Sequence, residues 1–134
     1  MPIEWTSDLS VGVAEIDRQH QELFRQINRL LEACHQGTAK ETVIEIVRFL
    51  SEYVVNHFSA EEKLMLQFSY PDYASHKNYH QQFMVSFQEL KHKLDSEGAG
   101  SHIVILTNRT VVNWLNSHIR NVDKLLGDFL KDKL

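Results

Sequence analysis

The sequence contains few of the residues that build tight turns or covalent cross-links. Among its 134 residues there are five glycines, two prolines and one cysteine. A many-stranded sheet uses glycine and proline at its frequent reversals, so their scarcity argues against such a sheet and favours a few long helices. A chain of this length suits one domain, and we predict a single all-α domain over residues 1–134.

The chain also lacks any run of lysine or arginine. Its 14 basic side chains are outnumbered by 18 acidic ones, for a net charge of −4. Binding to nucleic acid needs clustered cations, so we expect no nucleic acid partner. The lone Cys34 cannot form an internal disulfide and is typical of a reducing compartment. The start, Met-Pro-Ile-Glu-Trp, has neither a basic nor an apolar stretch, so we expect no signal peptide, no membrane association and a cytoplasmic location.

Glycine and proline divide the rest of the chain into four helical segments. We predict helices at residues 17–36, 40–66, 72–96 and 102–131, after an N-terminal arm of residues 1–16, with Asp17 as the N-terminal cap of the first helix. Because the connections are short, successive helices are expected to be antiparallel neighbours. The predicted architecture is an up-down-up-down antiparallel four-helix bundle.

Each predicted helix carries a stripe of inward-facing residues at the spacing of a bundle helix. The stripes comprise Ile16, His20, Leu23, Ile27 and Leu30; Val43, Val47, Leu50, Val54, His57, Glu61 and Leu64; His76, His80, Phe83, Phe87, Leu90 and Leu94; and Thr107, Val111, Trp114, His118, Val122, Leu125 and Phe129. Five histidines and one glutamate are therefore predicted to point inward. They occur near the start of the first and third helices and near the end of the second and fourth, which is the same end of an antiparallel bundle.

This layer of imidazoles and a carboxylate predicts a metal site. An isolated inward histidine is more often a hydrogen-bonded core residue, but imidazoles gathered in one apolar layer cannot all satisfy one another. A metal ion accepts all of their lone pairs, and the pairs His57/Glu61 and His76/His80 each lie four residues apart on one helix face. The sequence has no His-Glu-x-x-His zinc motif. The ligand number exceeds a tetrahedral zinc site, and imidazole with carboxylate suits iron, so we expect two iron ions.

The order and spacing of these residues resemble the hemerythrin family, in particular its single-domain bacterial members. The resemblance extends over nearly the whole chain and includes Trp5, the segment Val13-Ala14-Glu15-Ile16-Asp17-Arg18-Gln19-His20, His57-Phe58, Glu61-Glu62, Met65, Tyr70-Pro71, Trp114-Leu115 and His118-Ile119. It implies a further ligand, Asp123, which in a regular helix would point about 140° away from His118. We therefore expect the fourth helix to distort near Asn121.

The resemblance also implies how two irons, Fe2+ or Fe3+, are held. One iron would be held by His76, His80 and His118 and the other by His20 and His57, with Glu61, Asp123 and a hydroxide or oxide as bridges. One position would stay open on the iron with two histidines, and the family binds O2 there. The candidates for an apolar O2 pocket are Leu23, Phe58, Trp114 and Ile119, for which ordinary core packing is an equally good explanation.

The leading hypothesis is reversible O2 binding, for carriage, storage or delivery, by a monomer that has no catalytic residues. Two alternatives stay open. The same centre could react with peroxide or nitric oxide as an enzyme, or it could act as an O2 or redox sensor that needs a separate partner. The absence of an acid or base beside the ligands disfavours an enzyme. The remaining histidines, His35, His92 and His102, are expected to be exposed to solvent, and Cys34 is expected to be buried.

Overall fold

Long helices account for most of the structure. The computed structural model describes residues 3–37, 40–98 and 101–134. The first three helices of the bundle are α1 (Ala14–His35), α2 (Lys40–Gln67) and α3 (Tyr73–Glu97). The last is a continuous helical column of α4 (Ser101–Thr107), η2 (Asn108–Val112), α5 (Asn113–His118), η3 (Ile119–Asp123) and α6 (Lys124–Leu130), in which η2 and η3 are π-helical.

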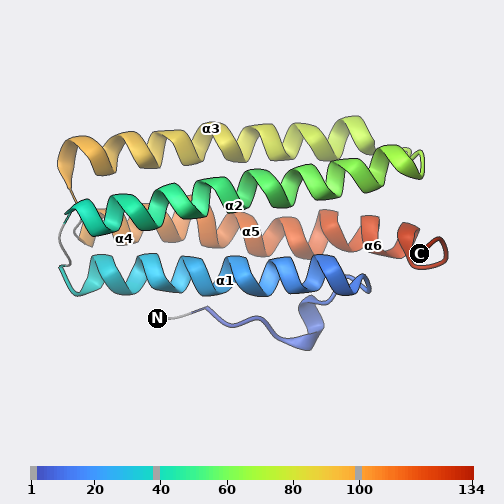
Figure 1. The fold of residues 1–134 in the computed structure, drawn as a ribbon, viewed down its shortest axis with the longest axis horizontal. Helices are drawn as coiled ribbons and strands as arrows, with labels where there is room; N and C mark the ends of the chain where they lie inside the picture. Colours follow the sequence, from blue (N-terminus) through green and yellow to red (C-terminus); the bar gives the residue numbers. More distant parts are fainter. Residues whose placement is uncertain (1–2, 38–39, 99–100) are drawn as a thin grey trace.

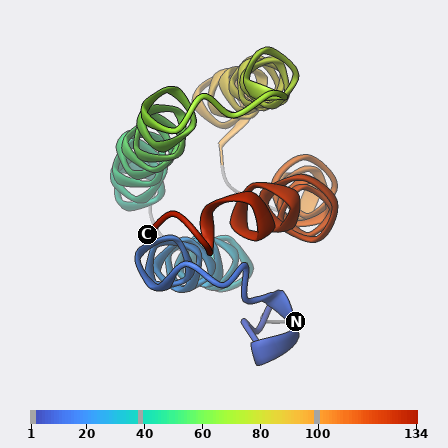
Figure 2. The ribbon, with the colours of Figure 1, turned by 90° about the vertical axis from the view of Figure 1, so that its right-hand side faces the viewer.

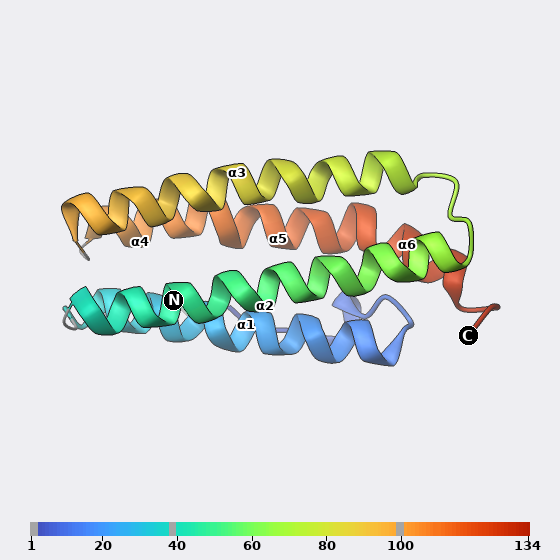
Figure 3. The same cartoon turned by 45° about the horizontal axis from the view of Figure 1, so that its top comes forward.

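The three helices and the column alternate in direction along one long axis (Figure 1). Viewed from the end of the bundle they surround a common core (Figure 2), and α1 lies beside α2 while α3 lies beside the column (Figure 3). The predicted all-α, up-down-up-down antiparallel four-helix bundle is confirmed, and the described residues contain no β-strand. None of the helices in the described ranges has both the length and the apolar character needed to cross a membrane.

The stripes predicted for the first three helices form the core. Their members are all buried, except Leu64, which is partly exposed. Large side chains such as Leu50 and Phe87 have no exposed surface. Burial of each such side chain contributes about 1.5–3 kcal/mol, and this packing fixes the level of each helix relative to its neighbours. The polar members of the stripes are therefore held at fixed heights in the bundle.

The stripe predicted for the fourth helix is buried at Thr107, Val111 and His118 and only partly buried at Trp114, and it is wrong beyond His118. The side chain of Leu125 is 57% exposed, and those of Val122 and Phe129 are only partly buried. The following residue in the sequence, Leu126, is completely buried instead. The inward face of this helix has therefore moved by one residue.

The π-helical turn η3 is the cause of this shift. The amide of Lys124 donates a hydrogen bond to the carbonyl of Ile119, five residues earlier, as in a π-helix. One extra residue in the turn rotates the following residues by about 100° relative to a regular helix. The distortion expected near Asn121 is confirmed, and it brings Asp123 into the core beside His118.

The first helix begins at Ala14, earlier than the predicted residue 17, and Asp17 does not cap it. The carboxylate of Asp17 holds the N-terminal arm instead. Its Oδ1 accepts a hydrogen bond from the amide of Val11 at 2.9 Å, and its Oδ2 accepts one from the hydroxyl of Ser10 at 2.5 Å. The arm includes a short 3-10 turn, η1 (Ser7–Leu9).

The arm lies against the C-terminal half of the helical column. Arg120 Nη1 donates a hydrogen bond to Asp8 Oδ2, and Lys124 Nζ donates one to the carbonyl of Asp8, both at 3.1 Å. A side-chain carbon at Gly127 would lie 1.8 Å from the carbonyl oxygen of Val11, so only glycine allows this close approach. The arm therefore covers the column at the π turn and just after it.

Leu126→Ala is expected to destabilise the protein much more than Leu125→Ala. Leu126 is completely buried, and truncation of such a side chain costs about 2–5 kcal/mol, whereas a change at an exposed site costs about 0.5 kcal/mol or less. Urea denaturation of the two variants measures the difference. Equal destabilisation would contradict the shifted register.

Candidate metal centre

Polar side chains from all four helices of the bundle meet in one layer, at the end where α2 connects to α3. The layer comprises His20 from α1, His57 and Glu61 from α2, His76 and His80 from α3, His118 from α5 and Asp123 from η3. The most exposed of them, His118, has 4% of its surface accessible to solvent. The structure thus brings together every residue that the sequence singled out as a candidate ligand.

Glu61 divides its carboxylate oxygens between two sets of histidines. Its Oε1 lies 3.0 Å from His80 Nε2 and 3.3 Å from His76 Nε2. Its Oε2 lies 3.2 Å from His57 Nε2 and 3.7 Å from His20 Nε2. One carboxylate therefore faces histidines on both sides.

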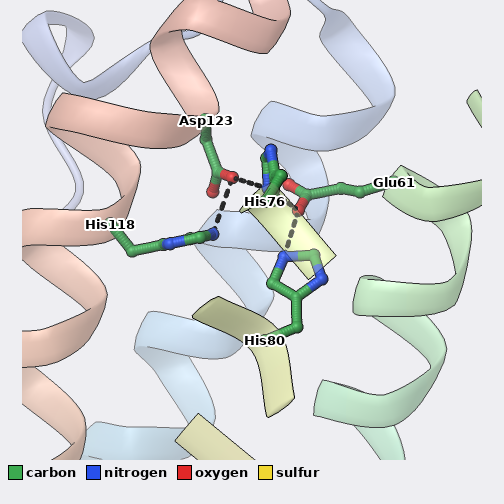
Figure 4. A group of neighbouring side chains, drawn as sticks. All are labelled: Glu61, His76, His80, His118 and Asp123. Atoms are coloured by element: carbon green, nitrogen blue, oxygen red, sulfur yellow. Dashed lines mark hydrogen bonds and ion pairs between the residues drawn. The ribbon is translucent and has the colours of Figure 1, made fainter. Parts of the chain in front are cut away.

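Asp123 is placed in the same way from the opposite helix. Its Oδ1 lies 3.0 Å from both His76 Nε2 and His118 Nε2, and its Oδ2 lies 3.0 Å from His20 Nε2. Figure 4 shows His118 and His80 pointing toward the carboxylates of Asp123 and Glu61. We call His76, His80 and His118 the three-histidine group, and His20 and His57 the two-histidine group.

Most of the inward-facing atoms in this layer lack a hydrogen-bond partner. Nε2 of His20, His57, His80 and His118, Oε2 of Glu61 and both oxygens of Asp123 are buried and, although they lie 3.0–3.7 Å from one another, form no hydrogen bond among the described residues. Each unpaired buried group costs about 1–3 kcal/mol, so the layer needs another partner. A metal ion accepts the lone pairs of imidazoles and carboxylates together, and the residues present fit one.

The distances also suit ligands that share an ion. If two ligand atoms each lie about 2.1 Å from a metal ion and the ligand–metal–ligand angle is a right angle, the two ligand atoms are about 3.0 Å apart. Two sets of ligand atoms lie within 4.8 Å of one another, one containing the three-histidine group and the other the two-histidine group. Glu61 and Asp123 belong to both sets. The arrangement can therefore hold two metal ions that share both carboxylates.

The charges in this layer are strongly coupled. Burial lowers the pKa of His20 and of His76, but the carboxylates of Asp123 and Glu61 outweigh burial and raise each of these pKa values to about 9. Burial raises the pKa of both carboxyl groups, but the neighbouring imidazoles hold each pKa well below its usual range. The carboxylates thus stabilise positive charge between the helices, as a metal site requires.

Comparison with known proteins identifies the family. The model of the hemerythrin HHE cation-binding domain matches residues 11–130 of the chain. The chain belongs to the hemerythrin family.

The similarity to related proteins extends over almost the whole chain. It is 30% identical over 130 residues to a bacteriohemerythrin of Stenotrophomonas maltophilia, covering 97% of this chain and 82% of that protein. It is 33% identical over 127 residues to a bacteriohemerythrin of Methylococcus capsulatus, covering 94% and 95%. Among solved structures, a wild-type hemerythrin has a TM-score of 0.85 and 30% sequence identity, over 98% of this chain and 99% of that chain.

Two imidazoles in the hemerythrin layer have hydrogen-bond partners outside it. His57 Nδ1 donates to Gln19 Oε1 at 2.6 Å, and His80 Nδ1 donates to Glu62 Oε2 at 3.0 Å. These bonds fix the tautomers that direct Nε2 of each ring into the layer. The role of Gln19 was not predicted from the sequence. Only its position next to His20 pointed to it, and its hydrogen bond is to His57 on another helix.

Aromatic rings cover the three-histidine group. Phe58 is stacked on His80 with ring centroids 3.8 Å apart, and Trp114 is stacked on His118 at 4.3 Å. Phe83 joins them, 5.7 Å from Phe58 and 4.5 Å from Trp114. These rings hold the imidazoles in place and exclude water from this side of the layer.

A small apolar cavity of about 10 Å³ lies one turn away from the layer. It is lined by Leu23, Ile27, Val54, Phe58, Phe83, Val111 and Leu115. The predicted pocket residues Leu23 and Phe58 are among them, whereas Trp114 and Ile119 are not. Leu23 and Val54 each lie three residues from a member of the two-histidine group, and Phe83 and Leu115 each lie three residues from a member of the three-histidine group. The cavity is therefore about one helical turn from both groups.

The remaining histidines lie outside the layer. His35, His92 and His102 are exposed, as predicted. Cys34 is buried, as predicted, and burial raises the pKa of its thiol. None of these side chains belongs to the two sets of ligand atoms.

Removal of metal from the purified protein is expected to lower its melting temperature by more than about 10 °C. Without metal the buried imidazoles and carboxylates lose the partner that offsets their burial, so the binding energy of the metal becomes folding energy. Circular dichroism before and after dialysis against a chelator measures the change. An unchanged melting temperature would contradict a metal-filled layer.

His118→Ala is expected to lose bound metal, whereas His92→Ala is expected to retain it. Both variants remove one imidazole, but His118 Nε2 lies in the layer and His92 is exposed. Elemental analysis of the two purified variants beside the unmodified protein measures the metal content per chain. Equal metal content in the two variants would refute the role assigned to His118.

Proposed function

We propose that this hemerythrin binds O2 reversibly at a pair of iron ions. The observation that carries the proposal is the division of Glu61 and Asp123 between the two histidine groups, with one oxygen of each carboxylate facing each group. A single ion bound by one histidine group would leave the second oxygen of each carboxylate, which faces the other group, without a metal partner. Imidazole combined with carboxylate suits iron, and the donor number exceeds what a tetrahedral zinc site takes.

The roles of the residues follow from this division. His76, His80 and His118 would hold one iron, and His20 and His57 the other. Glu61 and Asp123 would bridge the two ions together with a hydroxide or oxide. When bound, the iron pair supplies the electrons with which O2 is taken up and released. With six-coordinate ions, the two-histidine group would leave one position open to a small ligand.

The apolar cavity supports binding without further reaction. Its lining contains only aliphatic and aromatic side chains, and it lies about one helical turn from both histidine groups, including the one where the open position is proposed. An apolar wall excludes water and offers no proton to a bound ligand. Because no acid or base lines the cavity, a carrier, store or delivery protein is favoured over an enzyme that turns over peroxide or nitric oxide.

Mixing the diferrous protein with O2 in a stopped-flow spectrometer is expected to give a stable new absorption spectrum that reverses under vacuum. Reversal is expected because the cavity supplies no proton to release reduced oxygen from the centre. Zinc-loaded protein is the control, since zinc does not change its oxidation state and its spectrum is expected to stay unchanged. Rapid, irreversible oxidation with release of peroxide would refute the carrier proposal.

A further inference from the structure

The two histidine groups differ in the charge of their outer hydrogen-bond partners. In the three-histidine group, His80 Nδ1 is bonded to the carboxylate of Glu62. In the two-histidine group, His57 Nδ1 is bonded to the neutral amide of Gln19. Nδ1 of His20, His76 and His118 is buried without a partner. Each group therefore has one outer partner, and only one of the two partners is an acid.

A carboxylate and an amide have different effects on the imidazole that donates to them. Charge-assisted hydrogen bonds are roughly twice as strong as neutral ones. A carboxylate that accepts the Nδ1–H bond also makes the imidazole a stronger electron donor at Nε2. The ring of His80 is accordingly a stronger donor than the ring of His57. A stronger donor stabilises the higher oxidation state of the metal to which it is bound.

Both outer partners lie at the boundary between the buried layer and the surface. The side chain of Glu62 is 23% exposed and lines a groove of about 290 Å³ between α2 and α3. Gln19 lines a groove of about 460 Å³ between α1 and α2. Glu62 Oε2 lies only 3.0 Å from His80 Nδ1, so its charge acts on the ring through direct contact.

On the basis of the proposed iron pair, we propose that Glu62 and Gln19 are positioning residues that make the two iron sites electronically unequal. Glu62, through His80, lowers the reduction potential on the side of the three-histidine group. Gln19 orients His57 without adding charge and keeps the potential higher on the side where the open position is proposed. The site with the open position would then have the higher reduction potential of the two.

Exchange of the two outer partners tests this inference. Glu62→Gln keeps a side chain of the same length and removes the charge, so the midpoint potential of the iron-loaded protein is expected to rise. Gln19→Glu adds a charge beside His57, so the midpoint potential is expected to fall. Spectroelectrochemical titration measures both shifts. Glu52→Gln and Gln88→Glu make the same charge changes at exposed positions on α2 and α3 and are expected to leave the potential unchanged.

Glu62→Ala and Gln19→Ala separate charge from orientation. Both remove the acceptor, and loss of such an outer bond lowers metal affinity by about 10- to 100-fold. If Glu62 only orients His80, Glu62→Gln retains the potential of the unmodified protein while Glu62→Ala loses iron, and this result would overturn the inference. If Glu62→Gln and Gln19→Glu each bind two irons but have the midpoint potential of the unmodified protein, the inference is overturned and the proposed function stays intact. Absence of an iron pair from the unmodified protein would overturn both.

Discussion

The burial of two carboxylates among five imidazoles is the constraint on which the rest of this bundle depends. Neither kind of group is stable in an apolar interior without a partner, and here their donor atoms face one another with the lone pairs of most left unpaired. The layer is therefore stable only when cations, either protons or metal ions, lie between the helices. The three long helices and the helical column each contribute to the layer. A shift of any one of them along the bundle axis would therefore move its side chains out of contact with the others.

The sequence was sufficient to predict this layer because the information for it is local. The apolar stripes of the first three helices follow the regular period of an α-helix, and short connections set adjacent helices antiparallel. The same reasoning failed for the last helix, where a π turn advances the inward face from Leu125 to Leu126. A prediction from residue spacing assumes that every turn of the helix is regular. The inward position of Asp123 could therefore be predicted only from the resemblance to the family.

Contacts between distant segments could not be predicted from the sequence. The bond from His57 to Gln19 depends on how two helices are rotated about their axes. The bonds from Ser10 and Val11 to Asp17 depend on where the arm turns back. The close approach of Val11 to Gly127 joins segments from the two ends of the sequence. Such contacts follow from the assembled fold, and the pattern of residue types along one helix does not contain them.

The pairing of His20 with Asp123 has a consequence for how the protein is made. His20 is synthesised more than 100 residues before Asp123, and the arm docks on the column at the π turn η3 and just after it. A nascent chain that lacks the helical column has neither His118 nor Asp123, so it has only one of the two shared carboxylates. A metal site built from both carboxylates would therefore form only after the helical column has been synthesised and packed against α1.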